Sequence, residues 1–399
     1  MVTQRRMMAG NSLKIDENDK AGVPACNRLL WLTDTYSDHN GVSMVLRSVL
    51  EEIKKRNLPI DILVSSNRIE PDDHLVIVKP VSEFNFPFYR QQPIRIPNYL
   101  EIRRIFINGR YDRIICSTEG PMGLAAIYLK KMFSVPAFFY LHTDWIMFAK
   151  AVMKMQQRGL NNVERLLSFY YNRYDGLFVL NTEQQFWLSG ERMNMDPSRI
   201  FLTAHWVDEC FYPRVDHRAE LFGVNQETPV LLFAGRLSEE KGIMELPGLF
   251  QMAKKTIPGL TMIIAGTGPA ESQLRALLPD AVFLGWVDHE KLPDIYSSSD
   301  MLVLPSQFDT FSCVVLEAIS CGLPVIAYET KGPKDIVEDK VSGFLVKNKE
   351  EMVHFVVQYF LDEKPRDAMK QSALARSASY EAEAILNRLI SNIGMRNAG

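Results

Sequence analysis

The stretch Met301–Ala327 carries two carboxylates in apolar surroundings. Asp309 follows a predicted strand, and Glu317 lies within a predicted apolar helix that ends before Gly322. Acidic residues are common enough for such a pair to be two solvated charges. Asp309, however, would lie at the carboxyl end of a parallel strand, where open α/β sheets bind ligands and helix N-termini bind phosphate. Glu317 is flanked by core residues and needs a partner, because an unpaired buried charge is very unfavourable; we favour a ligand hydroxyl over a structural Arg or Lys.

Two cations stand at a second predicted strand-to-helix junction. Arg236 ends a strand, and Lys241 follows at the start of the next helix. An Arg guanidinium binds phosphate oxygens in bidentate fashion, and a Lys ammonium adds a mobile point charge. The pair could also be two surface cations, but cations are unfavourable at a helix N-terminus unless an anion joins them. We therefore expect a diphosphate site at this junction.

Three weaker motifs follow other predicted strands. Gly266 and Gly268 belong to a Gly-x-Gly loop that could be a simple turn, and it lacks the third Gly and the acidic residue of a dinucleotide fingerprint, so NAD binding finds little support. Gly41 would let the backbone approach a ligand where a helix begins, although an ordinary turn fits equally well. His142 opens a polar run straight after an apolar strand, which favours a place at the cleft, but lone histidines are more often structural.

The elements that would position these groups form two α/β halves. In the first half, apolar strands alternate with helical patterns, whereas Phe84–Tyr99 is rich in Pro and aromatic residues and is expected to be irregular. The strands are near-continuous apolar runs, which is typical of a parallel sheet covered on both faces. They are predicted at Arg28–Thr33, Pro59–Ser65, Arg113–Ser117, Val135–Leu141, Gly176–Leu180 and Ile200–Thr203.

The second half repeats this scheme after a predicted linker around His205–Arg214, and a final helical stretch, Asp367–Ile390, closes the chain. The expected fold class is therefore α/β, with two doubly wound, Rossmann-like domains facing across a cleft. The strands of the second half are predicted at Pro229–Ala234, Leu260–Ala265, Ala281–Leu284, Met301–Leu304, Pro324–Ala327 and Gly343–Val346.

Length and composition agree with two domains. A chain of 399 residues exceeds one ordinary core, and 47% hydrophobic with 23% charged residues is typical of a globular protein without a membrane span. Residues 1–25 are polar, lack an apolar signal-peptide core and are expected to be a disordered tail. We expect an N-terminal domain over residues 26–205, a C-terminal domain over residues 206–375, and a helix in residues 376–399 that packs back on the first domain.

Cysteine usage and charge disfavour several other classes. The five cysteines show no CxxC or Cys/His ligand spacing, which indicates reduced thiols of a cytoplasmic protein and disfavours metal binding through cysteine. The net charge of −3 combines a mildly basic first half with an acidic second half. Because neither half is strongly basic, nucleic acid is not an expected partner.

In this order the motifs resemble the retaining nucleotide-sugar glycosyltransferases of the GT-B fold, of the glycosyltransferase family 4 type. Six segments between Val230 and Val346 carry the resemblance: FAGRLSEEKG, IIAGTGP, FLGWV, LPDIYSSSDMLVLPS, DTFSCVVLEAISCGLPVIA and KGPKDIVEDKVSGFLV. The runs Asn40–Val42 and His142–Asp144 extend it to the first half. They look like the branch that attaches mannose, or related sugars such as sulfoquinovose, to lipid or polyprenyl acceptors.

The resemblance implies a nucleoside-diphosphate sugar, a UDP- or GDP-hexose, as donor co-substrate, with no cofactor and no metal. Arg236 and Lys241 would hold the diphosphate, and Glu317 would bind the ribose. Asp309 would contact the hydroxyls of the donor sugar, and His142 would contact that sugar from the first domain and help orient attack. Further donor contacts are implied for Gly41, Gly266, Gly268, Val287, Phe311, Ser312 and Cys313.

Two positions depart from the family pattern. Asp309 stands where the family has a Glu, which shortens its reach by one methylene, and Ser312 replaces a frequent Gly. Both changes concern the identity of the donor sugar rather than the reaction class.

The resemblance also implies a hydroxyl acceptor on a glycan or a lipid-linked molecule. The stretch Trp145–Tyr174 mixes Met, Phe and Tyr with Lys150, Lys154, Arg158, Arg165 and Arg173, so it could lie on anionic lipid at the inner face of the membrane, or be a solvated helix face over the core. Two alternatives stay open: a GT-B-like sugar-nucleotide epimerase that needs no acceptor, and a non-catalytic sugar-binding protein.

Overall fold

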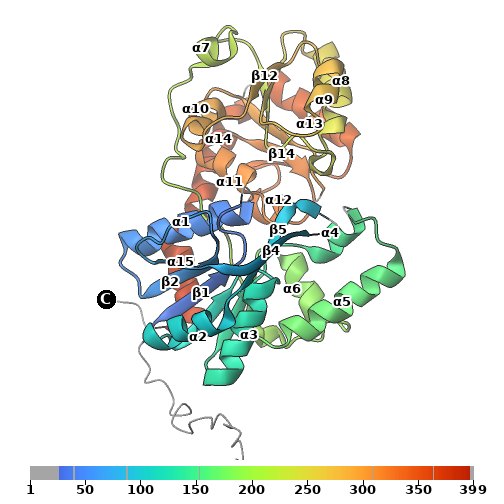
Figure 1. Cartoon of the computed structure of the whole chain (residues 1–399). Coiled ribbons are helices and arrows are strands. Elements are labelled where there is room, and N and C mark those ends of the chain that lie inside the picture. The colour runs from blue at the N-terminus through green and yellow to red at the C-terminus, as the bar shows by residue number, and fades with distance from the viewer. Residues whose placement is uncertain are drawn as a thin grey trace, which may run out of the picture.

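The computed structural model describes residues 27–395, except residues 39–40, 87–88, 152, 308 and 363. The predicted disordered tail of residues 1–25 and Asn40 of the first-half motif therefore lie outside the described residues. Figure 1 shows two lobes stacked on one another, the first drawn in blue to green and the second in yellow to red. Each lobe is built around one parallel sheet.

The sheet of the first lobe has seven parallel strands. They are β1 (Leu29–Thr33), β2 (Ile60–Ser65), β3 (Leu75–Val78), β6 (Arg113–Cys116), β7 (Ala137–Tyr140), β8 (Gly176–Val179) and β9 (Ile200–Leu202), in the order β3-β2-β1-β6-β7-β8-β9. Alternate residues of β1 belong to two different hydrophobic clusters, Leu29 and Trp31 to one and Leu30 and Leu32 to the other. Both faces of the sheet are thus covered, which is why its strands are continuous apolar runs.

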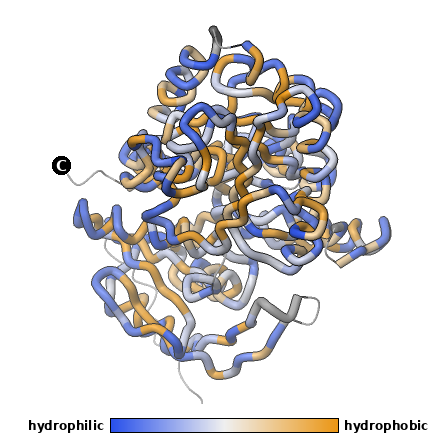
Figure 2. The backbone as a smooth tube through the Cα atoms, turned by 90° about the horizontal axis from the view of Figure 1, so that it is seen from above, coloured by the Kyte–Doolittle hydropathy of each residue, from blue (hydrophilic) through white to orange (hydrophobic). Residues whose placement is uncertain are grey.

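Helices provide the cover on both faces. They are α1 (Gly41–Lys55), α2 (Tyr99–Asn108), α3 (Pro121–Phe133), α4 (Trp145–Ala151), α5 (Gln157–Tyr171) and α6 (Thr182–Ser189). The buried face of α1 packs in the cluster that contains Trp31, whereas α2 and α3 pack in the cluster that contains Leu30. Figure 2 shows how apolar stretches, in orange, alternate with polar ones, in blue, along the chain.

The sheet of the second lobe has six parallel strands. They are β10 (Val230–Ala234), β11 (Thr261–Ala265), β12 (Val282–Gly285), β13 (Met301–Leu304), β14 (Val325–Tyr328) and β15 (Gly343–Val346), in the order β12-β11-β10-β13-β14-β15. Its helices are α7 (Arg218–Phe222), α8 (Leu246–Thr256), α9 (Glu271–Leu277), α10 (Leu292–Ser297), α11 (Cys313–Ser320), α12 (Pro333–Ile336), α13 (Lys349–Leu361) and α14 (Lys364–Ser377). The predicted α/β class with two doubly wound sheets is confirmed.

The sequence-based prediction for Phe84–Tyr99 is wrong. The segment expected to be irregular, Phe84–Tyr99, contains most of an antiparallel hairpin formed by β4 (Pro80–Phe86) and β5 (Tyr89–Pro97). Proline lacks the N–H that an inner strand needs, so prolines argue against a strand in the middle of a sheet. A two-stranded hairpin has two outer edges, and there Pro93 and Pro97 are tolerated.

The end of the chain also differs from the single helical stretch predicted over Asp367–Ile390. After α14 the chain forms a short 3-10 turn, Ala378–Tyr380, and then α15 (Ala382–Asn392). Tyr380 is buried and its hydroxyl donates to the carbonyl oxygen of Asp335 at 2.9 Å, which fixes the break. Figure 1 shows α15 beside the sheet of the first lobe, where its apolar face packs in the cluster of Trp31.

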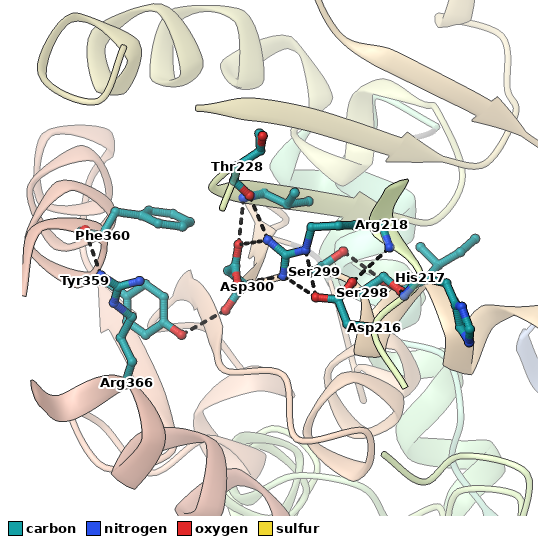
Figure 3. Close-up of polar contacts among 12 residues, drawn as sticks. Asp216, His217, Arg218, Thr228, Ser298, Ser299, Asp300, Tyr359, Phe360 and Arg366 are labelled. Carbon is teal, nitrogen blue, oxygen red and sulfur yellow. Dashed lines mark hydrogen bonds and ion pairs between the residues drawn. The ribbon is translucent and has the colours of Figure 1, made fainter. Parts of the chain in front are cut away.

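An ion pair between the buried Arg218 and the partly buried Asp300 ties α7 to the residue that directly precedes β13 (Figure 3). Arg218 places two guanidinium nitrogens at 3.1 Å from the two carboxylate oxygens of Asp300 and donates from Nε to Asp216 at 2.7 Å. Asp300 also accepts the backbone N–H of Val230 at 2.8 Å, directly at the start of β10. Figure 3 shows the Tyr359 hydroxyl approaching the same residue; it donates to the Asp300 carbonyl at 3.0 Å.

We predict that Asp300→Ala destabilises the protein by about 3 kcal/mol or more, because it leaves the buried Arg218 guanidinium with one carboxylate fewer. The measurement is urea unfolding followed by circular dichroism. Asp280→Ala serves as control, since the Asp280 side chain is 71% exposed and its ion pair with Lys254 should contribute less than about 1 kcal/mol. Equal losses for the two variants would contradict a stabilising role of the Arg218 network.

Candidate active site

The loops that follow the central strands of both sheets meet in a cleft between the lobes. The order of winding reverses between β1 and β6 in the first sheet and between β10 and β13 in the second. Ligands of open α/β sheets bind at such switch points, beyond the carboxyl ends of the strands. The cleft holds two adjoining cavities, of about 920 and about 400 Å³, whose walls share Gly41, Glu240 and Lys241.

The larger cavity lies between the Gly-x-Gly loop after β11 and the loop after β10. A Cβ on Gly266, which has a φ of 137°, would lie 1.9 Å from the carbonyl oxygen of Gly235, and one on Gly268 would lie 2.3 Å from that of Leu237. Both glycines therefore allow two backbones to touch. The predicted donor-site residues on the wall of this cavity are Gly41, Arg236, Lys241, Gly266, Gly268 and Val287.

Lys241 lies at the junction of the two cavities and forms an ion pair with Asp309. It ends a short 3-10 turn, and a Cβ on the following Gly242 would lie 2.0 Å from the carbonyl oxygen of Pro305. The loop after β10 is thus packed tightly on the loop after β13. Asp309 is buried, and its second oxygen, Oδ2, has no hydrogen-bond partner within the described part of the chain. That oxygen can accept a hydrogen bond from a ligand.

The smaller cavity contains His142, which lies two residues beyond the end of β7 and is buried. Burial lowers the pKa of His142 to about 3, so the imidazole is neutral at physiological pH. Neither ring nitrogen has a hydrogen-bond partner among the residues that the structure describes. A neutral imidazole offers one donor and one acceptor, and both are available to a ligand in this cavity.

Sequence reasoning missed His205, which also lines the smaller cavity. The rings of His142 and His205 are stacked, with centroids 5.3 Å apart and planes at 14°. Burial, followed by the proximity of His142, holds the pKa of His205 well below its ordinary value. A histidine just beyond the predicted strand that ends at Thr203 was the available signal, but it lay in a segment interpreted as linker.

The remaining predicted residues lie in α11 and in the loop that precedes it, at different depths. Phe311 and Cys313 line the smaller cavity, whereas Ser312 and Glu317 are not among the lining residues of either cavity. Glu317 lies one turn after Cys313 and accepts a hydrogen bond from the Tyr296 hydroxyl at 2.7 Å, and burial raises the pKa of its carboxyl. Contact of Glu317 with a ribose remains a prediction.

Polar contacts also join the two lobes across the cleft. Asp144, which belongs to the polar run after β7, forms an ion pair with Lys331 of the second lobe. The side-chain amide of Asn181 donates to the carbonyl oxygen of Thr310 at 2.8 Å. Asp144 and Thr310 both line the smaller cavity, so these contacts join the lobes at its walls.

Two features are absent from the described residues. No group of three or more His, Cys, Asp or Glu side chains there is arranged to hold a metal ion. None of the helices in that part of the chain has the length and apolar character needed to cross a bilayer.

Comparison with known proteins places both halves in glycosyltransferase families. The profile described as "Glycosyltransferase Family 4" matches residues 39–209, and the profile described as "Glycosyl transferases group 1" matches residues 218–376. A GDP-mannose-dependent alpha-mannosyltransferase of Corynebacterium glutamicum is 31% identical over 88% of this chain and 84% of its own length. An alpha-monoglucosyldiacylglycerol synthase of Streptococcus pneumoniae is 22% identical over 83% of this chain and 78% of its own.

The fold has solved counterparts as well. Sucrose-phosphate synthase from Thermosynechococcus elongatus superposes with a TM-score of 0.75 at 20% identity, covering 91% of this chain and 98% of that structure. The two matched profiles, the mannosyltransferase relative and the paired sheets agree with one another. The chain belongs to glycosyltransferase family 4 and is a nucleotide-sugar glycosyltransferase with the GT-B fold.

Proposed function

We propose that the protein moves a hexose from a nucleoside-diphosphate sugar to a hydroxyl acceptor, with retention of anomeric configuration and without a metal ion. The observation that carries this proposal is the position of Lys241 on the shared wall of the two cavities, together with Gly41 at the start of α1. The nucleoside would occupy the larger cavity and the sugar the smaller one. The diphosphate between them would meet Lys241, Arg236 and the N-terminal amides of α1.

Charge compensation at this junction would come from the protein itself. The departing diphosphate gains negative charge, which Arg236, Lys241 and the positive end of α1 would stabilise. The Lys241 ammonium is paired with Asp309 in the structure, and a phosphate would share that ammonium. Asp309 would then turn its carboxylate to hydroxyls of the sugar, one of them at the unpartnered Oδ2.

The reaction needs no pair of carboxylates acting as acid and base. The bond between the anomeric carbon and the phosphate oxygen breaks, and the acceptor oxygen bonds to that carbon on the same face. The proton of the acceptor hydroxyl passes to the leaving phosphate oxygen. His142 would hold a sugar hydroxyl through its neutral ring, and Glu317 would bind the ribose after exchanging the Tyr296 hydroxyl for it.

The donor and the acceptor are proposed from the relatives and from the cavity walls. The name of the 31% identical relative specifies GDP-mannose, and a GDP- or UDP-hexose is the proposed donor here. On the acceptor side the smaller cavity is lined by Val42, Val45, Met147 and Phe148. Such an apolar wall suits a lipid-linked or glycan acceptor with an apolar portion, and the name of the Streptococcus pneumoniae relative includes a diacylglycerol.

Lys241→Ala is expected to lower kcat/KM by about 100-fold or more, because the leaving diphosphate loses a preorganised cation. The assay measures release of nucleoside diphosphate from UDP-glucose and GDP-mannose in the presence of candidate acceptors, with product analysis to separate transfer from epimerisation. Lys255→Ala, which removes an exposed lysine of the same lobe, is the matched control and should behave like the wild type. Near-normal turnover by Lys241→Ala would refute the assignment.

Removal of divalent cations tests the second part of the proposal. Since Arg236, Lys241 and α1 would supply the positive charge, dialysis against EDTA is expected to leave the transfer rate unchanged. The same assay, repeated after adding back Mg²⁺ or Mn²⁺, provides the comparison. A rate that falls on chelation and returns with either ion would show that the protein needs a metal.

We further propose that the face of α5 contacts an anionic membrane when the acceptor is lipid-linked. Leu166 and Phe169, three residues apart on this helix, are 66% and 63% exposed. Arg165 is exposed beside them, and the Arg173 guanidinium lies 4.1 Å from the centre of the Phe169 ring. Apolar side chains among basic ones are typical of helices that lie in the membrane interface.

The double variant Leu166→Ser/Phe169→Ser is expected to weaken binding to vesicles that contain phosphatidylglycerol by about tenfold or more, because two apolar side chains no longer enter the bilayer. Co-sedimentation at low and high salt provides the measurement. Leu361→Ser removes a residue of similar exposure, 62%, from the second lobe and should have no effect. Unchanged binding of the double variant would exclude this face as the membrane contact.

A further inference from the structure

Among the described residues, the His142 ring contacts other rings and makes no hydrogen bond. A histidine that acts on a substrate is usually held by a hydrogen bond to one ring nitrogen while the other faces the ligand. Within the described residues neither nitrogen of His142 has such a partner. Its ring instead contacts Tyr140, with centroids 4.3 Å apart and planes at 31°, and stacks on His205.

His205 is itself held from two sides. Its Nδ1 lies 3.2 Å from the Tyr140 hydroxyl, within hydrogen-bonding distance. Its ring also meets the edge of the Phe311 ring, with centroids 4.8 Å apart and planes at 73°. Tyr140 belongs to β7 of the first lobe, whereas Phe311 belongs to the loop before α11 of the second. His205, on the segment that joins the lobes, therefore touches both.

We propose that His205 is a positioning residue that holds the imidazole of His142 by stacking and couples its orientation to the second lobe through Phe311. The His142 ring would then be fixed on the sugar only while Phe311 is in place beside His205. Movement of the loop that carries Phe311 would free both imidazoles together. His205 would act through its ring face, so an aromatic replacement should preserve its effect.

Charge is compatible with this arrangement, since both imidazoles are buried and neutral at physiological pH. Two protonated rings at a centroid distance of 5.3 Å would repel each other. Neutral rings can stack, and each keeps one donor and one acceptor.

The first test compares His205→Ala with His205→Phe. If His205 acts by stacking, His205→Ala should lower kcat by about tenfold to 100-fold, since a misplaced catalytic group is costly. KM for the donor should change little, because Arg236 and Lys241 are untouched. His205→Phe should stay close to the wild type. His217→Ala, which removes a histidine whose side chain is 46% exposed and lies outside both cavities, is the control.

The first test rests on the proposed function, because it measures turnover. The second test needs no turnover, so it examines the role of His205 independently of the proposed function. The imidazole carbons of His142 are followed by NMR in histidine-labelled protein between pH 4 and 8, with His142→Gln for assignment. The wild type and His205→Phe should show a neutral ring throughout. In His205→Ala, water replaces the lost ring, and the pKa of His142 should rise by about one unit or more.

Two outcomes would overturn the proposal. If His205→Phe loses as much activity as His205→Ala, His205 acts through its nitrogens and not through stacking. If the His142 titration is the same in the wild type and in His205→Ala, His205 does not shape the surroundings of that ring. Thermal melting of each variant shows whether it is folded. A wild type that releases no nucleoside diphosphate would refute the proposed function and leave the NMR test valid.

Discussion

Parallel pairing of strands is the constraint on which the rest of the structure depends. Because every strand of a parallel sheet points the same way, all loops that follow the strands emerge at one edge. In each sheet the winding reverses once, so two of these loops diverge and leave a crevice. In this protein the carboxyl ends of the strands of one sheet face those of the other sheet across the cleft. Residues as distant in sequence as Gly41, His142 and Lys241 consequently meet in one cleft.

Burial of polar groups at this edge explains the chemistry of the site. Asp309 and His142 are both removed from water, and they respond in different ways. The carboxylate keeps a cation, Lys241, as partner, whereas the imidazole has none and is neutral. A buried group with unused hydrogen-bonding capacity is unfavourable in isolation, and a ligand with matching hydroxyls relieves that cost. The unused hydrogen-bonding groups of the cleft thus match a ligand with several hydroxyl groups.

Much of this arrangement could be predicted from the sequence, and the reasons are physical. Strands such as Met301–Leu304 are buried on both faces, and their sequences are therefore continuous apolar runs. The polar residues that follow such parallel strands lie together at the same end of the sheet. The contact of Lys241 with Asp309 could not be predicted, because the two residues are 68 positions apart in the sequence. They meet only because Gly242 lets the loop after β10 pack closely on the loop after β13. The hairpin β4–β5 was hidden by its prolines. His205 was overlooked because it lay in a segment interpreted as linker, and because its neighbours Tyr140, His142 and Phe311 are distant in the sequence.

The return of α15 to the first lobe has a consequence for biosynthesis. The apolar face that carries Leu29 and Trp31 is completed by Leu386 and Leu389, and these residues are made only after the entire second lobe. During translation one face of the first sheet therefore remains partly exposed until the second lobe and α15 have been synthesised. Ribosome-bound chains would expose an apolar surface that is buried in the folded protein. Chaperones that recognise apolar strands could bind that surface.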